Sequence, residues 1–225
     1  MSQLALPLKL QDHAVFDSFW PAGNEEAVAF LDAIASTRSG PGAFVHGGAA
    51  TGKSHLLQAL CERAGIGIYL PLGELETEEA ALLDGLAAQR LVCLDDVHAV
   101  TGNDNWELGL FELLNEIVDT GGTVVASAHA APRACGFALA DLSSRFARLP
   151  VFQLSALPDA ERVNALKLRA RHRGLDLPDD TATYMLNRSR RDMTSLYRLL
   201  DRLDSEALKA KRRLTIPFVR EIIGH

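Results

Sequence analysis

The chain has 225 residues, 48% of them hydrophobic and 23% charged, with 23 Lys and Arg against 29 Asp and Glu and a formal net charge of -6. This composition is that of an ordinary globular protein and excludes disorder over the whole length. No apolar run approaches the roughly 18 residues that cross a bilayer, and the first residues lack the pattern of a signal peptide, so we expect a cytoplasmic protein.

The first predicted helix begins behind Asn24. Residues 1–12 form a short tail, and the aromatic segment 16–20 then leads through a Pro and a Gly to Asn24. The Asn24 side chain can accept a backbone N–H and cap a helix, and Ala27, Leu31 and Ile34 follow at helical spacing.

Short apolar runs then alternate with helical patterns. The runs predict strands at 43–46, 66–72, 91–94, 123–128 and 151–154, and the patterns between them predict helices at 53–64, 78–89 and 106–118. Because the apolar character of each strand is continuous, both of its faces should be covered, which requires a parallel sheet between helices. The sequence therefore predicts an α/β fold.

Strand patterns stop after Pro158, and helical patterns fill the rest of the chain. Pro158 suits the first turn of a helix that ends near Arg173, Gly174 suits its left-handed exit, and Pro178 opens a second helix. Further helices are predicted at 192–210 and 217–223. We expect a tail over 1–12, an α/β subdomain over 13–156 and an all-helical subdomain over 157–225.

Net charge differs between these parts. Residues 1–154 carry 8 basic and 19 acidic side chains, whereas residues 155–225 carry 15 basic and 10 acidic ones. The difference predicts two modules with different partners, and solvated helix faces explain the basic half equally well. The three cysteines, Cys61, Cys93 and Cys135, are far apart and are expected to be reduced packing residues.

The strongest motif lies between the first strand of the sheet and the helix that follows it. In the pattern G-x-x-x-x-G-K-[ST], backbone N–H groups surround phosphate oxygens, the lysine reaches the outer phosphates and the hydroxyl coordinates Mg²⁺. The alternative is a Gly-rich turn with a surface lysine. The predicted nucleotide-binding residues here are Gly47, Gly48, Ala49, Ala50, Thr51, Gly52, Lys53, Ser54 and the adjacent His55.

Two carboxylates end the third predicted strand. An apolar strand that ends in Asp95 and Asp96 can bring Asp95 to a magnesium ion held by Ser54, while Asp96 orients an attacking water. Strand ends are commonly polar, so these carboxylates alone are weak evidence for a metal site. Together with the phosphate-loop motif they become strong evidence. Asp95 is thus a second predicted metal ligand, and Asp96 a predicted catalytic residue.

With these motifs and three further segments, the sequence resembles the DnaA-related branch of the AAA+ ATPases, most closely the Hda-type regulatory inactivators of the replication initiator DnaA. The further segments are Phe16-Asp17-Ser18-Phe19-Trp20-Pro21, Leu142-Ser143-Ser144-Arg145-Phe146 and Thr215-Ile216-Pro217-Phe218-Val219. The resemblance implies a five-stranded parallel sheet followed by a helical lid, with bound ADP or ATP and Mg²⁺.

The resemblance also gives roles to two arginines. Arg145 matches the arginine finger that acts on the nucleotide of a neighbouring subunit, and Arg191 matches the sensor-2 arginine that reaches from the lid to the nucleotide. Without the resemblance, Arg145 would be read as a helix-surface arginine, and the alternative for Arg191 is a solvated basic run. Asp96 is one methylene shorter than the Glu of most AAA+ motors, and Ser127 and His129 stand where relatives more often have Thr and Asp. These departures imply weak or no ATPase activity of the chain itself.

The tail resembles the short peptides that dock on the β sliding clamp of DNA polymerase. Its predicted clamp-binding residues are Gln3, Leu4, Leu6, Pro7 and Leu8. Burial of leucines in a groove of the clamp would stabilise such a complex by about 1.5 to 3 kcal/mol for each side chain before ordering costs. The alternative is an N-terminal strand that folds onto its own domain.

Taken together, the resemblance implies a negative regulator of replication initiation that docks on the DNA-loaded clamp and stimulates ATP hydrolysis by DnaA in trans. It further implies that DNA is contacted mainly through the clamp, and a chain that carries both a hydrophobic tail and a finger is expected to form a homodimer or a larger assembly. The main alternative is an autonomous AAA+ ATPase that loads or remodels a replication complex, and a small-molecule P-loop kinase is a third.

Overall fold

The computed structural model describes residues 14–75, 80–188 and 192–224. The described residues form two compact units: one comprises 14–16 and the described part of Asn24–Ser155, and the other comprises Asp17–Gly23 and the described residues from Ala156 to Gly224. The phosphate-loop motif and both predicted magnesium ligands lie in the first unit.

The first unit is built on a five-stranded sheet in the order β2-β3-β4-β1-β5, and all four strand pairs are parallel. The strands are β1 (Ala43–His46), β2 (Ile68–Pro71), β3 (Leu91–Asp95), β4 (Thr123–Ala128) and β5 (Val151–Gln153). Every residue of β3 and β4 is buried. The continuous apolar runs thus fold as predicted, and the α/β fold is confirmed.

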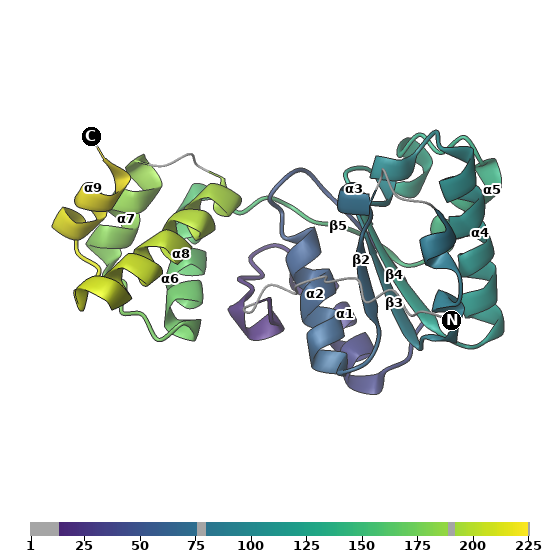
Figure 1. The fold of residues 1–225 in the computed structure, drawn as a ribbon, viewed down its shortest axis with the longest axis horizontal. Coiled ribbons are helices and arrows are strands. Elements are labelled where there is room, and N and C mark those ends of the chain that lie inside the picture. Colours follow the sequence, from purple (N-terminus) through teal and green to yellow (C-terminus); the bar gives the residue numbers. More distant parts are fainter. Residues whose placement is uncertain (1–13, 76–79, 189–191, 225) are drawn as a thin grey trace. The chain divides into compact units, whose positions relative to one another are not determined.

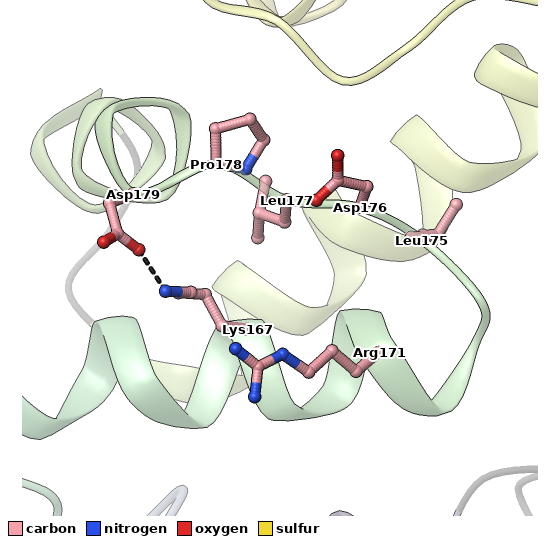
Figure 2. A pocket seen from close by; sticks show the side chains of 7 residues that line it. All are labelled: Lys167, Arg171, Leu175, Asp176, Leu177, Pro178 and Asp179. Atoms are coloured by element: carbon pink, nitrogen blue, oxygen red, sulfur yellow. Dashed lines mark hydrogen bonds and ion pairs between the residues drawn. The ribbon is translucent and has the colours of Figure 1, made fainter.

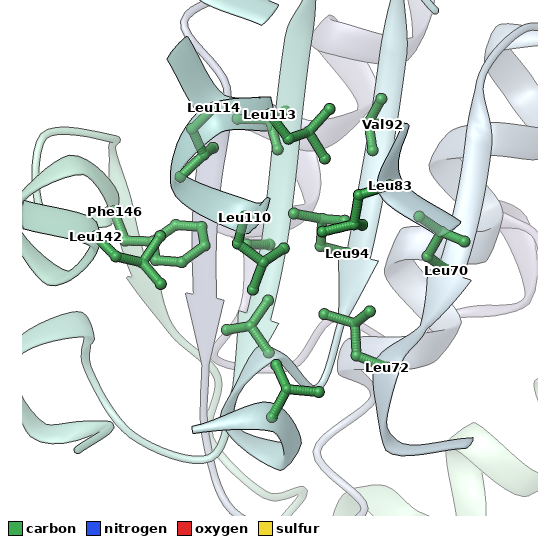
Figure 3. Packing of buried hydrophobic residues seen from close by; sticks show 14 of the residues in the cluster. Leu70, Leu72, Leu83, Val92, Leu94, Leu110, Leu113, Leu114, Leu142 and Phe146 are labelled. Carbon is green, nitrogen blue, oxygen red and sulfur yellow. The ribbon is translucent and has the colours of Figure 1, made fainter. Parts of the chain in front are cut away.

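Helices cover both faces of the sheet (Figure 1). On one face α1 (Glu25–Thr37) packs against α2 (Lys53–Ala64), and on the other α4 (Asp104–Asp119) packs against α5 (Ala140–Phe146). The short α3 (Leu72–Leu75) follows β2. The sheet and the α4 side enclose a cluster that includes Leu70, Leu72, Leu83, Val92, Leu94, Leu110, Leu113, Leu114, Leu142 and Phe146 (Figure 3).

The helix predicted over 78–89 is wrong. The described part of this range forms two short 3₁₀ helices, η2 (Ala80–Leu83) and η3 (Leu86–Ala88), separated by Gly85 with φ +78°. A left-handed glycine ends an α-helix, so the helical spacing of the apolar residues could not be realised here. Leu83 and Ala87 are nevertheless buried in the cluster beside α4.

Asn24 does not cap α1 through its side chain, contrary to the prediction. Its amide instead donates to the Ser155 carbonyl at 3.2 Å, and its Oδ1 accepts the Ser155 N–H at 2.8 Å. This pair of bonds satisfies the backbone N–H and carbonyl of Ser155, which follows the last residue bonded to β1, and it explains why the side chain turns away from the helix. The three cysteines are free and buried, as predicted.

The second unit contains four helices in its described residues: α6 (Asp159–His172), α7 (Asp179–Arg188), α8 (Met193–Ala210) and α9 (Ile216–Ile223). Gly174 takes φ +70°, as its predicted place after the first of them requires. Trp20 packs on the helical core and its Nε1 donates to Glu161 Oε2 at 2.8 Å, so the segment 17–23 joins this unit. Over the described residues, none of the helices is long and apolar enough to cross a membrane.

Ion pairs join α6 to α8 in this unit. Arg173 lies 2.7 Å from Asp201 and 3.5 Å from Asp204, and the buried Arg169 stacks on Tyr197 with 4.3 Å from its guanidinium carbon to the ring centroid. Burial, opposed by Asp201, lowers the pKa of Arg169. A buried guanidinium needs such partners, so these groups fix the two helices against each other.

Candidate functional site

The phosphate-loop motif forms the turn between β1 and α2. Gly52 and Ala50 have φ of +96° and +58°, and α2 begins at Lys53. A Cβ on Gly47 would lie 2.5 Å from the backbone oxygen of Leu154, so only glycine fits at this position. Gly48 has open space around it. The loop therefore owes its path to Gly47 and to the two left-handed residues.

Lys53 is turned into this loop and is only 8% exposed. Its Nζ donates to the carbonyl oxygens of Gly47 and Gly48, each at 3.0 Å, and the Thr51 hydroxyl donates to the Gly48 carbonyl at 3.0 Å. Lysine is rarely buried without partners, and here loop carbonyls supply them. The ammonium is thus held at the place where a polyphosphate would need a positive charge.

His55 is placed differently from the other residues of the motif. Its Nε2 hydrogen-bonds the carbonyl of Val15 at 2.9 Å, which ties α2 to the segment ahead of α1. His46 lies at the other end of the loop, where burial and then Lys53 lower its pKa. His55, which was predicted to bind nucleotide, therefore contacts the backbone of its own chain at Val15.

Asp95 ends β3 and is 3% exposed. Its Oδ1 accepts the hydroxyl of Ser127 on β4, and its Oδ2 accepts the hydroxyl of Tyr69 on β2 at 2.6 Å. The same Tyr69 hydroxyl hydrogen-bonds Ser54. The two predicted magnesium ligands, Ser54 and Asp95, are thus brought to one shared hydroxyl.

Tyr69 was not among the sequence-predicted site residues. Burial, and then the charge of Asp95, raise the pKa of Tyr69 well above the ordinary range, so the hydroxyl stays protonated and donates a hydrogen bond to Asp95. A tyrosine near the end of a buried strand looks like a core residue in the sequence. Its role depends on the strand order, which places β2 beside β3.

Asp96 follows Asp95 in the left-handed conformation, with φ +53°. Its N–H donates to Ser127 Oγ at 3.0 Å, and its Oδ1 lies 3.8 Å from His98 Nδ1. Burial and then Asp95 raise the pKa of Asp96, while Lys53, His98 and His129 oppose the rise. A carboxylate with a raised pKa is a better proton acceptor, as a group that orients water should be.

His98 and His129 stack edge to face beside this carboxylate, with 4.2 Å between ring centroids. Burial is the largest influence on His98 and lowers its pKa, although Asp96 acts in the opposite direction. His98 is therefore mostly neutral at pH 7, and its contact with Asp96 is not a strong ion pair. Within the described residues, no group of three or more His, Cys, Asp and Glu side chains could hold a metal ion by itself.

The loop and carboxylates fit a nucleotide with magnesium. The Gly47 turn leaves the loop backbone free of side-chain bulk, Lys53 supplies the charge, and Ser54 and Asp95 supply hard oxygen ligands of the kind that Mg²⁺ takes. When bound, Mg²⁺ would neutralise phosphate charge at this point.

Arg145 lies on α5, over the side of the sheet opposite α2. The side chain is half-buried, and its guanidinium carbon is 5.9 Å from the centre of the Phe111 ring on α4. Within the described residues, no carboxylate comes within ion-pair distance of it. Arg191 and the predicted clamp-binding residues Gln3, Leu4, Leu6, Pro7 and Leu8 lie outside the described residues.

A pocket of about 290 Å³ lies in the helical unit, where α6 turns into α7 (Figure 2). An ion pair between Lys167 and Asp179 spans it. The lining contains no residue that the sequence predicted for nucleotide or partner binding; it consists of Lys167, Arg171, Leu175, Asp176, Leu177, Pro178 and Asp179. The candidate site is therefore the phosphate loop with its carboxylates, and not this pocket.

Comparison with known proteins agrees with this geometry. Residues 159–223 match the family described as the Hda lid domain. The whole fold is similar to domain III of the replication initiator DnaA from Thermotoga maritima, with a TM-score of 0.79 and 18% identity over 96% of this chain and 97% of that one.

Two further solved structures share the fold. DnaA from Aquifex aeolicus bound to AMPPCP has a TM-score of 0.69 and 22% identity, over 90% of this chain and 69% of that one. The RuvB Holliday-junction branch-migration motor from Thermotoga maritima has a TM-score of 0.67 and 17% identity, over 95% and 72%. Residues 159–223 thus match the Hda lid family, and the fold of the chain is that of DnaA domain III.

Proposed function

We propose that this protein is a negative regulator of replication initiation, which holds a nucleotide in its own phosphate loop and stimulates ATP hydrolysis by DnaA through Arg145. The observation that carries the proposal is the lid of the Hda family joined to a complete phosphate-loop site. Such a regulator would work in the cytoplasm, where DnaA and the clamp meet DNA.

The nucleotide-binding part of the proposal rests on Lys53 and Asp95. Lys53 would exchange its two carbonyl acceptors for phosphate oxygens, and the loop N–H groups at the start of α2 would bind the same phosphates. Ser54 and Asp95 would hold Mg²⁺, and ADP or ATP are both compatible with these contacts. DnaA from Aquifex aeolicus, which shares this fold, is AMPPCP-bound, and this supports a nucleotide ligand for the chain.

The partner-directed part rests on Arg145. A half-buried guanidinium that contacts a ring face keeps hydrogen-bond donors for an outside anion, and the Phe111 ring limits where it points. Placed against the γ-phosphate of ATP in DnaA, it would stabilise the negative charge that develops in the transition state. We include in the proposal that the tail 1–12 docks on the DNA-loaded clamp and that the free protein self-associates.

Single-turnover hydrolysis of ATP by DnaA, in the presence of clamp-loaded DNA, tests the finger. We expect Arg145→Ala to reduce the stimulated rate by about 10³-fold or more, the range found for arginine fingers. Arg148→Ala is the matched control, because Arg148 is an exposed arginine just beyond the same helix. An unchanged rate with Arg145→Ala, or an equal loss with Arg148→Ala, would refute the role.

A pull-down with purified clamp tests the tail separately. Gln3→Ala/Leu6→Ala should abolish retention of the full chain, while Arg145→Ala should leave retention unchanged. Light scattering of the free protein with and without ADP tests self-association, and a monomer in both conditions would contradict that part of the proposal.

The second candidate is an autonomous AAA+ ATPase, which the raised pKa of Asp96 beside the phosphate loop favours. Its measurement is steady-state ATP hydrolysis by the purified chain without DnaA or clamp. A turnover abolished by Lys53→Ala would establish it. We expect instead weak or no turnover, because Asp96 is one methylene shorter than the Glu that most AAA+ motors have at this place.

A further inference from the structure

Glu107 is a buried carboxylate in the first turn of α4, with 1% of its surface exposed. It accepts three backbone hydrogen bonds: Oε1 from the N–H groups of Gly102 at 2.7 Å and Ala138 at 3.0 Å, and Oε2 from that of Leu139 at 2.6 Å. In the described part of the chain no Lys, Arg or His forms an ion pair with it. Its charge is therefore held by backbone dipoles.

These bonds keep Glu107 ionised. Burial alone would raise its pKa, but the hydrogen bonds from Leu139, Gly102 and Ala138 together outweigh burial, and the pKa is lowered. At neutral pH the side chain is thus a pure acceptor, and hydrogen bonds to a charged acceptor are about twice as strong as those between neutral groups.

The three donors belong to two different loops. Gly102 lies in the loop between η4 (Val97–Val100), which follows Asp96, and the start of α4. Ala138 and Leu139 come directly before α5. Leu139 is the N-cap residue of α5 and has no side-chain cap of its own, so the acceptor at the start of this helix is supplied from α4.

The same helix, α4, also supplies the ring beneath Arg145. Phe111 is one turn after Glu107, and the Arg145 guanidinium lies over it. Leu142 and Phe146 bury one face of α5 and set its rotation, but apolar packing is non-directional and does not fix the position along the helix axis. Directional contacts supply that constraint: the hydrogen bonds to Glu107 hold the start of α5 to α4, and Ser143 Oγ on α5 donates to the Pro132 carbonyl at 3.2 Å.

We infer that Glu107 is the positioning residue for Arg145: it fixes the start of α5 to α4 and so sets where the guanidinium is presented to a partner. The importance of Arg145 in this inference rests on the proposed function. The hold of Glu107 on α5 rests only on contacts within this chain. Placement matters because a displacement of about 1 Å at a reacting group can cost about 100-fold in rate.

Amide hydrogen exchange tests the hold on α5 without any partner. Glu107→Gln keeps the size of the side chain but turns one acceptor into an NH₂ donor that faces backbone N–H groups. We expect the amides of Ala138 and Leu139 to exchange about 10-fold to 100-fold faster, as the loss of hydrogen bonds to a charged group requires. Glu116→Gln, an exposed site on the same helix, should change nothing, and unchanged exchange in Glu107→Gln would overturn the inference.

The wild-type chain gives a second measurement that does not depend on the folding of a variant. The amides of Gly102, Ala138 and Leu139 lie outside the helices and strands, yet they should be protected nearly as well as those of the sheet. Exchange at the rate of an open loop would overturn the inference even if Glu107→Gln fails to fold.

Kinetics of the DnaA reaction tests the consequence for Arg145. With Glu107→Gln we expect the maximal stimulated rate to fall at least about 10-fold, while the concentration that gives half-maximal stimulation changes less than about 2-fold. A change in the half-maximal concentration alone would show that Glu107 acts on docking and would overturn the inference. If Arg145→Ala itself has no effect, the proposed function fails, and hydrogen exchange still decides whether Glu107 holds α5.

Discussion

Replacement of Tyr69 by Phe removes one oxygen and isolates the contact between β2 and Asp95. The hydroxyl donates to Asp95 Oδ2 at 2.6 Å and also hydrogen-bonds Ser54 and Gln58. Asp95 is 3% exposed, so bulk water cannot readily replace the lost donor. A hydrogen bond to a charged group contributes about 1.5 to 3 kcal/mol, and we expect Tyr69→Phe to lower the free energy of unfolding of the α/β unit by about 2 kcal/mol.

The assay must report on the α/β unit alone, because two units need not unfold together. Exchange of the slowest amides of β3 under native conditions gives the free energy of global opening for this unit. Tyr184→Phe is the matched control: Tyr184 lies on α7 in the other unit, and within the described residues its hydroxyl has no hydrogen-bond partner. Equal stability of Tyr69→Phe and the wild type would refute the hydrogen bond as a stabilising contact.

The same substitution should act in the opposite direction on metal binding. Loss of the hydroxyl leaves one oxygen of Asp95 without its donor, so this oxygen is freed for Mg²⁺ or its water ligands. The ratio of the ADP dissociation constants without and with Mg²⁺ should therefore be larger in Tyr69→Phe than in the wild type. An unchanged ratio would show that the tyrosine does not compete with the metal.

Two further substitutions test the site. Burial and then Asp95 raise the pKa of Asp96, so the folded state prefers the protonated carboxyl. The stability gained from protonation is complete below the unfolded pKa of about 3.9, and it is lost as the pH rises through the folded pKa. Asp96→Asn should therefore raise the urea midpoint at pH 7 and lose this advantage near pH 3, and an equal effect at both would contradict the shift. Gly47→Ala, whose Cβ would meet Leu154 O at 2.5 Å, should cost about 1 to 3 kcal/mol in urea unfolding, whereas Gly48→Ala, with open space, should cost less than about 0.5 kcal/mol.

The sequence was sufficient for the sheet because its signals are local. Continuous apolar runs predicted five strands, and β1 and β4 have the predicted bounds. The phosphate loop was predicted between β1 and α2 because its glycines and lysine follow in one short segment, and that is where it lies. Periodicity failed over 80–88, where Gly85 takes a left-handed conformation and the chain still buries Leu83 by another route.

Contacts between distant segments had no such local signal. Glu107 looks like a solvated acid on an amphipathic helix, and its three donors lie 5, 31 and 32 residues away. Tyr69 reaches Asp95 over 26 residues, and only the order of strands brings them together. Asn24 had a plausible local partner and took one 131 residues away. A polar side chain takes whichever partner would otherwise stay unsatisfied, and that choice is made by the tertiary fold.

The two cations to which the proposed function gives roles, Lys53 and Arg145, differ in what holds them. The ammonium of Lys53 already has two carbonyl acceptors within the loop, so it lies ready in place for an anion bound by its own chain. The guanidinium of Arg145 contacts the Phe111 ring and meets no carboxylate among the described residues. A guanidinium has five N–H donors. Unlike a carboxylate, a ring face does not pair with these donors through oxygen acceptors, so most of them remain available to an outside acceptor. The proposed division of work needs this difference: the lysine serves the nucleotide of this chain, and the arginine serves that of a partner.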